Sequence, residues 1–204
     1  MFSHNCFDMK RQVEAKMPTD WGVFRMIAYA EEEAEKMPHI AMVHEKADLT
    51  KPVLVRVHSE CMTGDLFHSQ RCDCGEQLDE AMRLAAQQKG MVIYLRQEGR
   101  GIGLINKLHA YNLQDKGLNT VDANVHLGLE IDGRDYQIAI EIMQDLGIEK
   151  IHLLTNNPLK IEAIDHSPIE VISRVPLIIL PKKENRNYLK TKQEQMGHLF
   201  NIIN

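Results

Sequence analysis

The chain has 204 residues, of which 44% are hydrophobic and 26% charged, with a formal net charge of −5 at pH 7. This composition is typical of one globular domain, and the acidic balance predicts no nucleic-acid partner. No apolar stretch approaches the ~18 residues needed to cross a bilayer, and the N-terminal segment lacks a signal-peptide core, so we expect no membrane partner and a cytoplasmic location.

Hydrophobic periodicity predicts a succession of strands and helices after an N-terminal arm of residues 1–18. The expected strands cover residues 21–29, 39–45, 52–58, 91–95 and 151–154, and an apolar segment over 169–179 that Pro176 divides or confines to a sheet edge. The expected helices cover residues 76–89, 102–116, 134–146 and 188–199. Because strands and helices intermix, we predict an α/β fold, with residues 19–204 forming a single domain whose mixed β-sheet is flanked by helices.

The densest chemical signal is a group of three cysteines within fourteen residues, Cys61, Cys72 and Cys74. Three thiolates can hold Zn²⁺ and leave its fourth position open, as catalytic zinc sites do. The spacing is not that of a standard zinc finger, so two buried, reduced thiols remain an alternative. The cysteines are expected at the end of a strand, in a loop and at the start of a helix, where binding groups often lie.

Three further segments combine polar residues with glycine or proline at the ends of predicted elements. The first runs from Arg96 to Gly103, a loop whose backbone amides and arginines suit phosphate, although it could be an ordinary turn. The second, Asp132–Asp135, fits a helix cap better than a catalytic site when taken alone. The third, Thr155–Lys160, leaves a strand at the edge where α/β proteins bind ligands, and it also fits a simple turn.

Taken together, these segments resemble GTP cyclohydrolase II, the enzyme of the first committed step of riboflavin synthesis. The resemblance runs from about Val13 to Leu199 and rests on a series of motifs in the family's order and spacing: HSEC…RCDCG, RQEGRGIGL, NKLHAYNLQD, DANVHLG, DGRDY, LLTNNPLK and RVPL…NYLKTKQEQMGHL. One departure is Asp122, where many relatives have glutamate, and it lies outside the implied site. The arm is too short for the synthase domain that often precedes this one, so the stand-alone enzyme is expected.

The resemblance implies a site residue by residue. It implies one zinc ion on Cys61, Cys72 and Cys74, with Asp132 as general base, Arg134 as the proposed nucleophile and Tyr111 near the purine. The implied nucleotide contacts are Arg56, Val57, His58, Ser59, Glu60, Gln77, Glu98, Gly99, Arg100, Thr120, Thr155 and Lys160. From the chemistry of guanine, which presents donors at N1 and N2, we expect Glu98 or a neighbouring acceptor to select the base.

The implied reaction opens the imidazole ring of GTP and releases formate and pyrophosphate. The product is 2,5-diamino-6-(5-phosphoribosylamino)pyrimidin-4(3H)-one. Zinc would activate water at C8, and Mg²⁺ would accompany the triphosphate. Arginine is an awkward nucleophile because its high pKa leaves little neutral guanidine, so attack by water with Arg134 stabilising charge stays open. The resemblance suggests a homodimer. Two alternatives are a paralogue that stops at the formamide and a non-catalytic protein that binds zinc or GTP.

Overall fold

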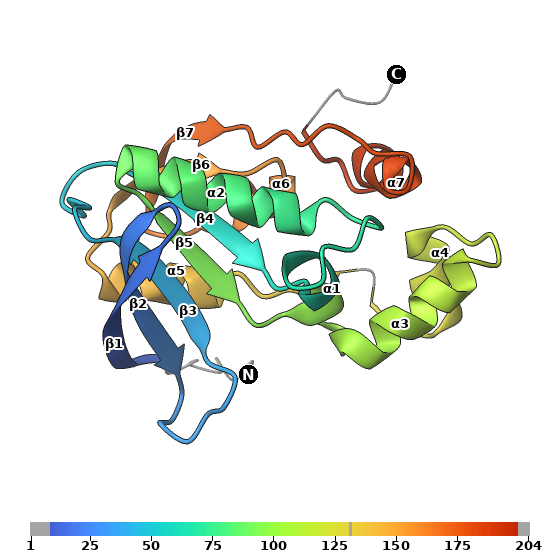
Figure 1. Ribbon diagram of the computed structural model, residues 1–204, viewed down its shortest axis with the longest axis horizontal. Coiled ribbons are helices and arrows are strands. Elements are labelled where there is room, and N and C mark those ends of the chain that lie inside the picture. The colour runs from blue at the N-terminus through green and yellow to red at the C-terminus, as the bar shows by residue number, and fades with distance from the viewer. Residues whose placement is uncertain (1–8, 131, 200–204) are drawn as a thin grey trace.

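The computed structural model describes residues 9–130 and 132–199, and it confirms the α/β class (Figure 1). The strands are β1 (Lys10–Thr19), β2 (Gly22–Ala30), β3 (His39–His44), β4 (Val53–Ser59), β5 (Met91–Leu95), β6 (Lys150–Leu154) and β7 (Glu170–Val175). The helices are α1 (Met62–Asp65), α2 (Cys74–Gln88), a 3₁₀ turn η1 (Glu98–Gly101), α3 (Gly103–Gln114), α4 (Thr120–His126), α5 (Gln137–Asp145), α6 (Pro158–Asp165) and α7 (Arg186–Gln195). No helix in this described part is both long and apolar enough to span a membrane.

The sheet is mixed, as predicted, and its order is β1-β2-β3-β5-β4-β6-β7. The strands β1, β2, β3 and β5 pair antiparallel in succession, whereas β5, β4, β6 and β7 pair parallel. The chain passes from β4 to β5 on one side and then returns across β4 to reach β6. Strand order therefore reverses beside β4, and parallel α/β sheets bind ligands at such a reversal, outside the carboxyl ends of the strands.

Two hydrophobic layers cover the faces of the sheet, and β4 contributes to both. Val53, Val55 and Val57 point into the larger layer, which includes Ile142 and Met143 of α5. The intervening Leu54 packs in the smaller layer with residues of α2. The alternation of one strand therefore separates the two layers, with α2 on one face and α5 on the other (Figure 1).

Several boundaries differ from the sequence-based expectation. Residues 10–18 of the predicted arm form most of β1, an edge strand paired with β2, so their assignment to a loose arm is wrong; residues 1–8 lie outside the described residues. The apolar segment after residue 169 forms a single edge strand that ends at Val175, immediately before Pro176. The predicted helix 134–146 begins later, at Gln137, and residues 132–136 form a loop without regular secondary structure. Short helices α1, α4 and α6 were not predicted.

Candidate metal and nucleotide site

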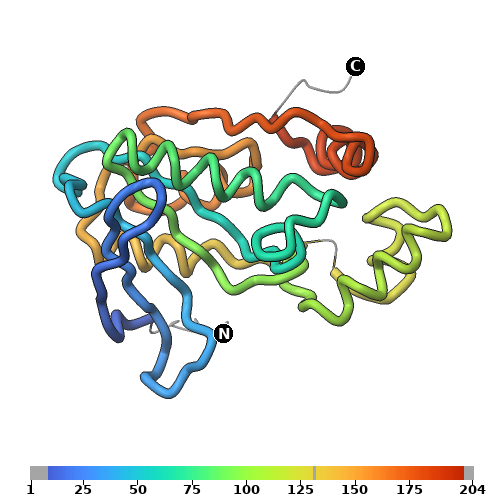
Figure 2. Tube along the Cα trace, viewed as in Figure 1, coloured from blue at the N-terminus to red at the C-terminus, as the bar shows by residue number. Residues whose placement is uncertain are grey.

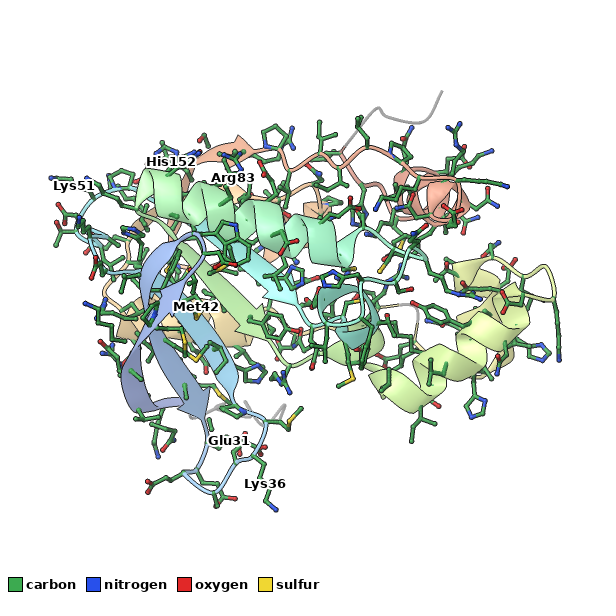
Figure 3. All side chains as sticks on the ribbon, viewed as in Figure 1. Glu31, Lys36, Met42, Lys51, Arg83 and His152 are labelled. Atoms are coloured by element: carbon green, nitrogen blue, oxygen red, sulfur yellow. The ribbon has the colours of Figure 1, made fainter. Side chains whose placement is uncertain are left out.

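The candidate site lies where β4 and β5 end, between α1, the first turn of α2, α3, α4 and α7 (Figures 1 and 2). One cavity there is lined by residues of β4, α2, α3, α4 and α7 and of the loops between them. The labelled Lys51 and His152 lie toward the opposite end of the sheet in Figure 3. The carboxyl ends of parallel strands thus bring together segments that are far apart in the sequence.

The three cysteines form one cluster, with sulfur atoms within 4.8 Å of one another. Cys61 follows β4, and Cys74 is the first residue of α2. The sulfur atoms of Cys61 and Cys72 are 3.6 Å apart, close to the ~3.8 Å expected for two thiolates on a tetrahedral zinc ion. The donor set is soft and three-fold, so these residues fit zinc with one position open.

Gly64 of α1 makes the cluster possible because it carries no side chain. A β-carbon at this position would lie 2.9 Å from Cys72 Sγ, 3.0 Å from Cys74 Cβ and 3.3 Å from Cys61 Sγ. Hydrogen bonds from Cys72 and Cys74 lower the pKa of the Cys61 thiol and raise the pKa of both donors, so the cluster easily forms one thiolate. A cation among the sulfurs would stabilise all three thiolates.

Lys107 of α3 joins this cluster to the glycine-rich loop. Its Nζ lies 3.1 Å from Cys61 Sγ and 2.7 Å from Glu98 Oε1, and the side chain is buried. The Glu98 carboxylate also accepts hydrogen bonds from the backbone amides of Gly99, at 2.7 Å, and Met62, at 2.6 Å. Three protein donors therefore occupy most of the lone pairs of the Glu98 carboxylate, which would otherwise be available to accept hydrogen bonds from guanine.

Arg100 occupies an unusual backbone conformation in the same loop. Its φ of 63° is left-handed, which is uncommon for a residue other than glycine. Both terminal guanidinium nitrogens are buried and have no hydrogen-bond partner among the described residues. The neighbouring Gly101, at φ 90°, passes so close to Gly133 that a β-carbon would lie 2.9 Å from the Gly133 oxygen. The loop thus places at the cavity a guanidinium that lies 6.0 Å from the centre of the Tyr188 ring and whose terminal nitrogens have no hydrogen-bond partner among the described residues, which is typical of an anion site.

Asp132 and Arg134 form a bidentate ion pair. Arg134 Nε donates to Asp132 Oδ1 at 2.7 Å, and Nη2 donates to Oδ2. Although burial opposes ionisation, the pairing raises the pKa of Arg134, and the hydrogen bonds from Arg134 lower the pKa of Asp132. Asp135, the other acid of this segment, accepts a hydrogen bond at 2.7 Å from the amide of Gln137, the first residue of α5, so the segment contains both a contact with the helix start and a partly buried ion pair.

Two more buried cations complete the basic side of the cavity. Arg56 Nη1 donates to the Leu154 oxygen at 3.1 Å, and Lys160 Nζ donates to the Val57 oxygen at 2.8 Å. Burial and the nearby Arg56 and Arg134 lower the pKa of Lys160. Lys160 is placed by α6, whose N-terminus is capped by the Asn157 side chain and begins with Pro158. Thr155–Lys160 is therefore a capped helix start, in place of a simple turn.

The structure brings almost all of the predicted site residues to this cavity. Lining it are Cys61, Cys72, Cys74, Arg56, His58, Ser59, Glu60, Gln77, Glu98, Gly99, Arg100, Tyr111, Thr120, Arg134, Thr155 and Lys160. Two predicted residues do not line it. The Val57 side chain packs in the larger hydrophobic layer and only its carbonyl faces Lys160, while Asp132 lies behind Arg134.

Sequence reasoning missed the residues that hold these groups in place. Asp65 accepts hydrogen bonds from Tyr94 Oη and the Cys61 amide, both at 2.9 Å, and its two oxygens lie 3.1 Å from His58 Nε2. The His58 and Tyr94 rings stack, with centroids 5.5 Å apart. Asp65 carried no local signal, because an acid in a polar loop is most often solvated.

The comparisons with known proteins identify the family of this chain. The family model of GTP cyclohydrolase II matches residues 10–176. The chain belongs to this family. Riboflavin biosynthesis protein RibBA of Bacillus cereus (strain G9842) is 51% identical over 193 residues, covering 94% of this chain and 48% of the relative. RibBA of Chlorobium phaeovibrioides is 50% identical over 193 residues, covering 94% and 47%. This GTP cyclohydrolase II family member therefore spans about half the length of the curated relatives that it matches.

Among solved structures, RibBX of A. baumannii, a two domain 3,4-dihydroxy-2-butanone 4-phosphate synthase, has a TM-score of 0.48 and 19% identity. The alignment covers 86% of this chain and 42% of the RibBX chain.

All of the predicted site residues lie inside the segment that matches the GTP cyclohydrolase II family. Helix α7, which also lines the cavity with Tyr188 and Lys192, lies beyond it.

Proposed function

We propose that this protein hydrolyses GTP, opening the imidazole ring and releasing formate and pyrophosphate in riboflavin synthesis. One observation carries the proposal: a single cavity brings together three cysteines that could hold a metal ion and a cluster of cations that includes Arg100, whose terminal nitrogens have no hydrogen-bond partner among the described residues. GTP requires this combination, because its C8 carbon and its triphosphate are separate reacting centres. Family membership and the similarity to RibBA proteins support the same reaction.

The reaction consumes water at both centres. One water opens the ring at C8, a second frees formate, and a third cleaves the bond between the α- and β-phosphates to give pyrophosphate. The remaining product is 2,5-diamino-6-(5-phosphoribosylamino)pyrimidin-4(3H)-one. Zinc, when held by Cys61, Cys72 and Cys74, supplies a Lewis acid that makes water nucleophilic at neutral pH.

The residues of the chain supply binding and charge. Arg100, Arg56 and Lys160 are the proposed triphosphate contacts, with Thr155 and Thr120 at the cavity wall and Mg²⁺ shared with phosphate oxygens. Tyr111, whose Oη lies 3.5 Å from Thr63 Oγ1, flanks the proposed purine position beside the cysteines. The remaining proposed contacts are Ser59, Glu60, His58, Gln77, Gly99 and the Val57 carbonyl.

For Arg134 we propose a charge-stabilising role at the α-phosphate. Its ion pair with Asp132 raises the pKa of the guanidinium, which makes the neutral, nucleophilic form scarcer still at pH 7. Asp132 then orients Arg134, and water attacks phosphorus. A covalent guanidine–phosphate adduct, sought by mass spectrometry after rapid quenching with GTP, would contradict this assignment.

For Glu98 the proposal is that it orders the loop and fixes Lys107, because its carboxylate already accepts from three protein donors. The Lys107 ammonium in turn stabilises the Cys61 thiolate through a charge-assisted hydrogen bond. Base selection then falls to other acceptors of the cavity.

The deciding experiment is incubation with GTP and Mg²⁺, with formate and pyrophosphate assayed separately. Equal amounts of both products support the proposal. Pyrophosphate with a formyl group retained on the product would instead indicate a paralogue that stops at the formamide. Neither product, despite GTP binding, would indicate a non-catalytic protein.

Homodimerisation and cytoplasmic location are further proposals. The first rests on the family resemblance, and light scattering after size-exclusion chromatography tests it. The second rests on the three cysteines, which must stay reduced to bind metal and therefore suit a reducing compartment.

A further inference from the structure

Helix α7 forms a wall of the cavity although it lies outside the segment that matches the family model. Most of its residues are polar, but Leu189, Thr191 and Lys192 are buried. Lys190 of the same helix is exposed, and its Nζ lies 3.8 Å from Glu194 Oε1. Two lysines of one helix thus have opposite environments, and the buried one requires a partner.

The partner of Lys192 is the residue between two cysteines of the metal cluster. Lys192 Nζ lies 3.1 Å from Asp73 Oδ1, and the two residues are 9% and 3% exposed. The same ammonium lies 4.4 Å from the centre of the Tyr188 ring, one turn earlier on α7. Asp73 stands between Cys72 and Cys74, so this ion pair connects α7 directly to the metal-binding loop.

The connection continues from Asp73 to the phosphate side of the cavity. Gln77 Nε2 donates to Asp73 Oδ2, and Gln77 Oε1 accepts from Arg56 Nη2 at 2.6 Å. Because Asp73 fixes the orientation of the Gln77 amide, the amide oxygen faces Arg56. One buried network therefore runs from α7 through the metal loop and α2 to β4, and all of its side chains but that of Asp73 line the cavity.

We propose that Lys192 is a positioning residue that latches α7 onto the metal-binding loop and, through Asp73 and Gln77, sets the position of Arg56. The expected effect on GTP turnover rests on the proposed function, whereas the expected effect on zinc binding does not. Lys192 holds Asp73 rather than a ligand atom, so its loss displaces the loop that carries Cys72 and Cys74. The latch makes α7 part of the active site.

The test compares Lys192→Met with Lys190→Met, which changes an exposed lysine of the same helix. We expect Lys192→Met to weaken zinc binding about tenfold in competition with a chromogenic chelator, and to lower kcat/KM for GTP by 10- to 100-fold, as removal of an outer partner of a metal site does. Lys190→Met should match the wild type in both measurements, and Lys192→Arg should recover part of the loss. Circular dichroism and Tm establish that each variant is folded at the assay temperature.

A second variant guards against simple misfolding, since removing Lys192 alone leaves the buried charge of Asp73 uncompensated. The double variant Asp73→Asn/Lys192→Met removes both charges, and under the latch proposal it stays defective in zinc affinity. Return of the double variant to wild-type zinc affinity and kcat/KM would overturn the proposal, as would a folded Lys192→Met that matches Lys190→Met in both. Should the wild type release neither formate nor pyrophosphate, the proposed function fails, while the zinc measurement still decides the latch.

Discussion

The antiparallel and parallel halves of the sheet differ sharply in what they carry. In β1, β2 and β3 the chain returns through short connections, and none of their residues lines the candidate cavity. In β4, β5 and β6, parallel pairing places all three carboxyl ends at one edge, and the segments that follow supply the cysteines, the arginine loop and the start of α6 over Thr155–Lys160.

The difference follows from the geometry of connection. An antiparallel hairpin alternates its ends, so consecutive loops lie on opposite edges of the sheet. Parallel strands need long crossovers, and every loop that leaves a carboxyl end reaches the same edge. We therefore expect substitutions in the parallel half to change chemistry, and substitutions in the antiparallel half to change stability alone.

The largest effect is expected for the metal cluster. Cys72→Ser should lose zinc and reduce formate release by about 10³-fold or more, because Lewis-acid stabilisation is worth several kcal/mol. Pyrophosphate release should persist in part, since its centre is the basic side of the cavity. Metal analysis and separate product assays measure both, with Cys6→Ser as the control. Full metal content in Cys72→Ser, or joint loss of both products despite normal GTP binding, would contradict the two-centre arrangement.

The next effect is expected at the unpaired guanidinium. Arg100→Ala should lower kcat/KM for GTP by about 10²-fold, because a charge-assisted bidentate contact with phosphate is lost. The matched control is Arg83→Ala on α2, where the guanidinium is bound to Glu80 on the surface. Steady-state kinetics of pyrophosphate release provide the measurement. Equal activities of the two variants would remove Arg100 from the triphosphate site.

A smaller effect is expected for the loop carboxylate. Glu98→Gln should reduce kcat/KM about tenfold for GTP and ITP alike, because it weakens the hold on Lys107 and the loop without touching the base. The ratio of kcat/KM for GTP to that for ITP is the measured quantity. ITP lacks the 2-amino group, so a ratio that falls in the variant would show that Glu98 reads guanine directly.

The smallest effect is expected in the antiparallel half. Tyr29 of β2 donates a hydrogen bond to Asp145 at 2.7 Å, and Tyr29→Phe should cost about 1 kcal/mol and lower Tm by about 2–4 °C without changing activity. Burial raises the pKa of Asp145, but hydrogen bonds from Tyr29 and Arg11 outweigh it and lower the pKa. A carboxylate whose pKa is lowered by folding stabilises the fold at pH values above its pKa in the unfolded chain. This stabilisation is lost as the pH falls through its pKa in the folded protein.

The difference in Tm between wild type and Tyr29→Phe should therefore shrink below about pH 4, the ordinary range of an aspartate. Thermal melts from pH 7 to pH 3 measure this trend. A change in kcat/KM for GTP in this variant would break the division between the two halves.

The sequence predicted which chemical groups the site contains more fully than it predicted how the side chains pack. The alternation of Val53, Val55 and Val57 by itself predicts one buried face of β4, and the three cysteines predict a cluster that can hold a metal. Polar residues on the other face, Arg56 and His58, favour an exposed surface when the strand is taken alone, yet both are buried together with Leu54. The sequence of one strand does not reveal that α2 covers its second face, and the burial of Arg56 depends on that cover.

Residue types and their order therefore determined the family, the cysteine cluster and the cations of this protein, because thiolates and guanidinium groups keep their chemistry in any fold. Only the tertiary structure added Lys107 and Lys192 to the residues of the site. Lys107 and Lys192 each lie in a helix whose local pattern fits a solvated lysine. They are buried because Cys61 and Asp73, from distant parts of the chain, meet them. Such partners depend on long-range packing at the carboxyl edge of the sheet, which no local pattern encodes.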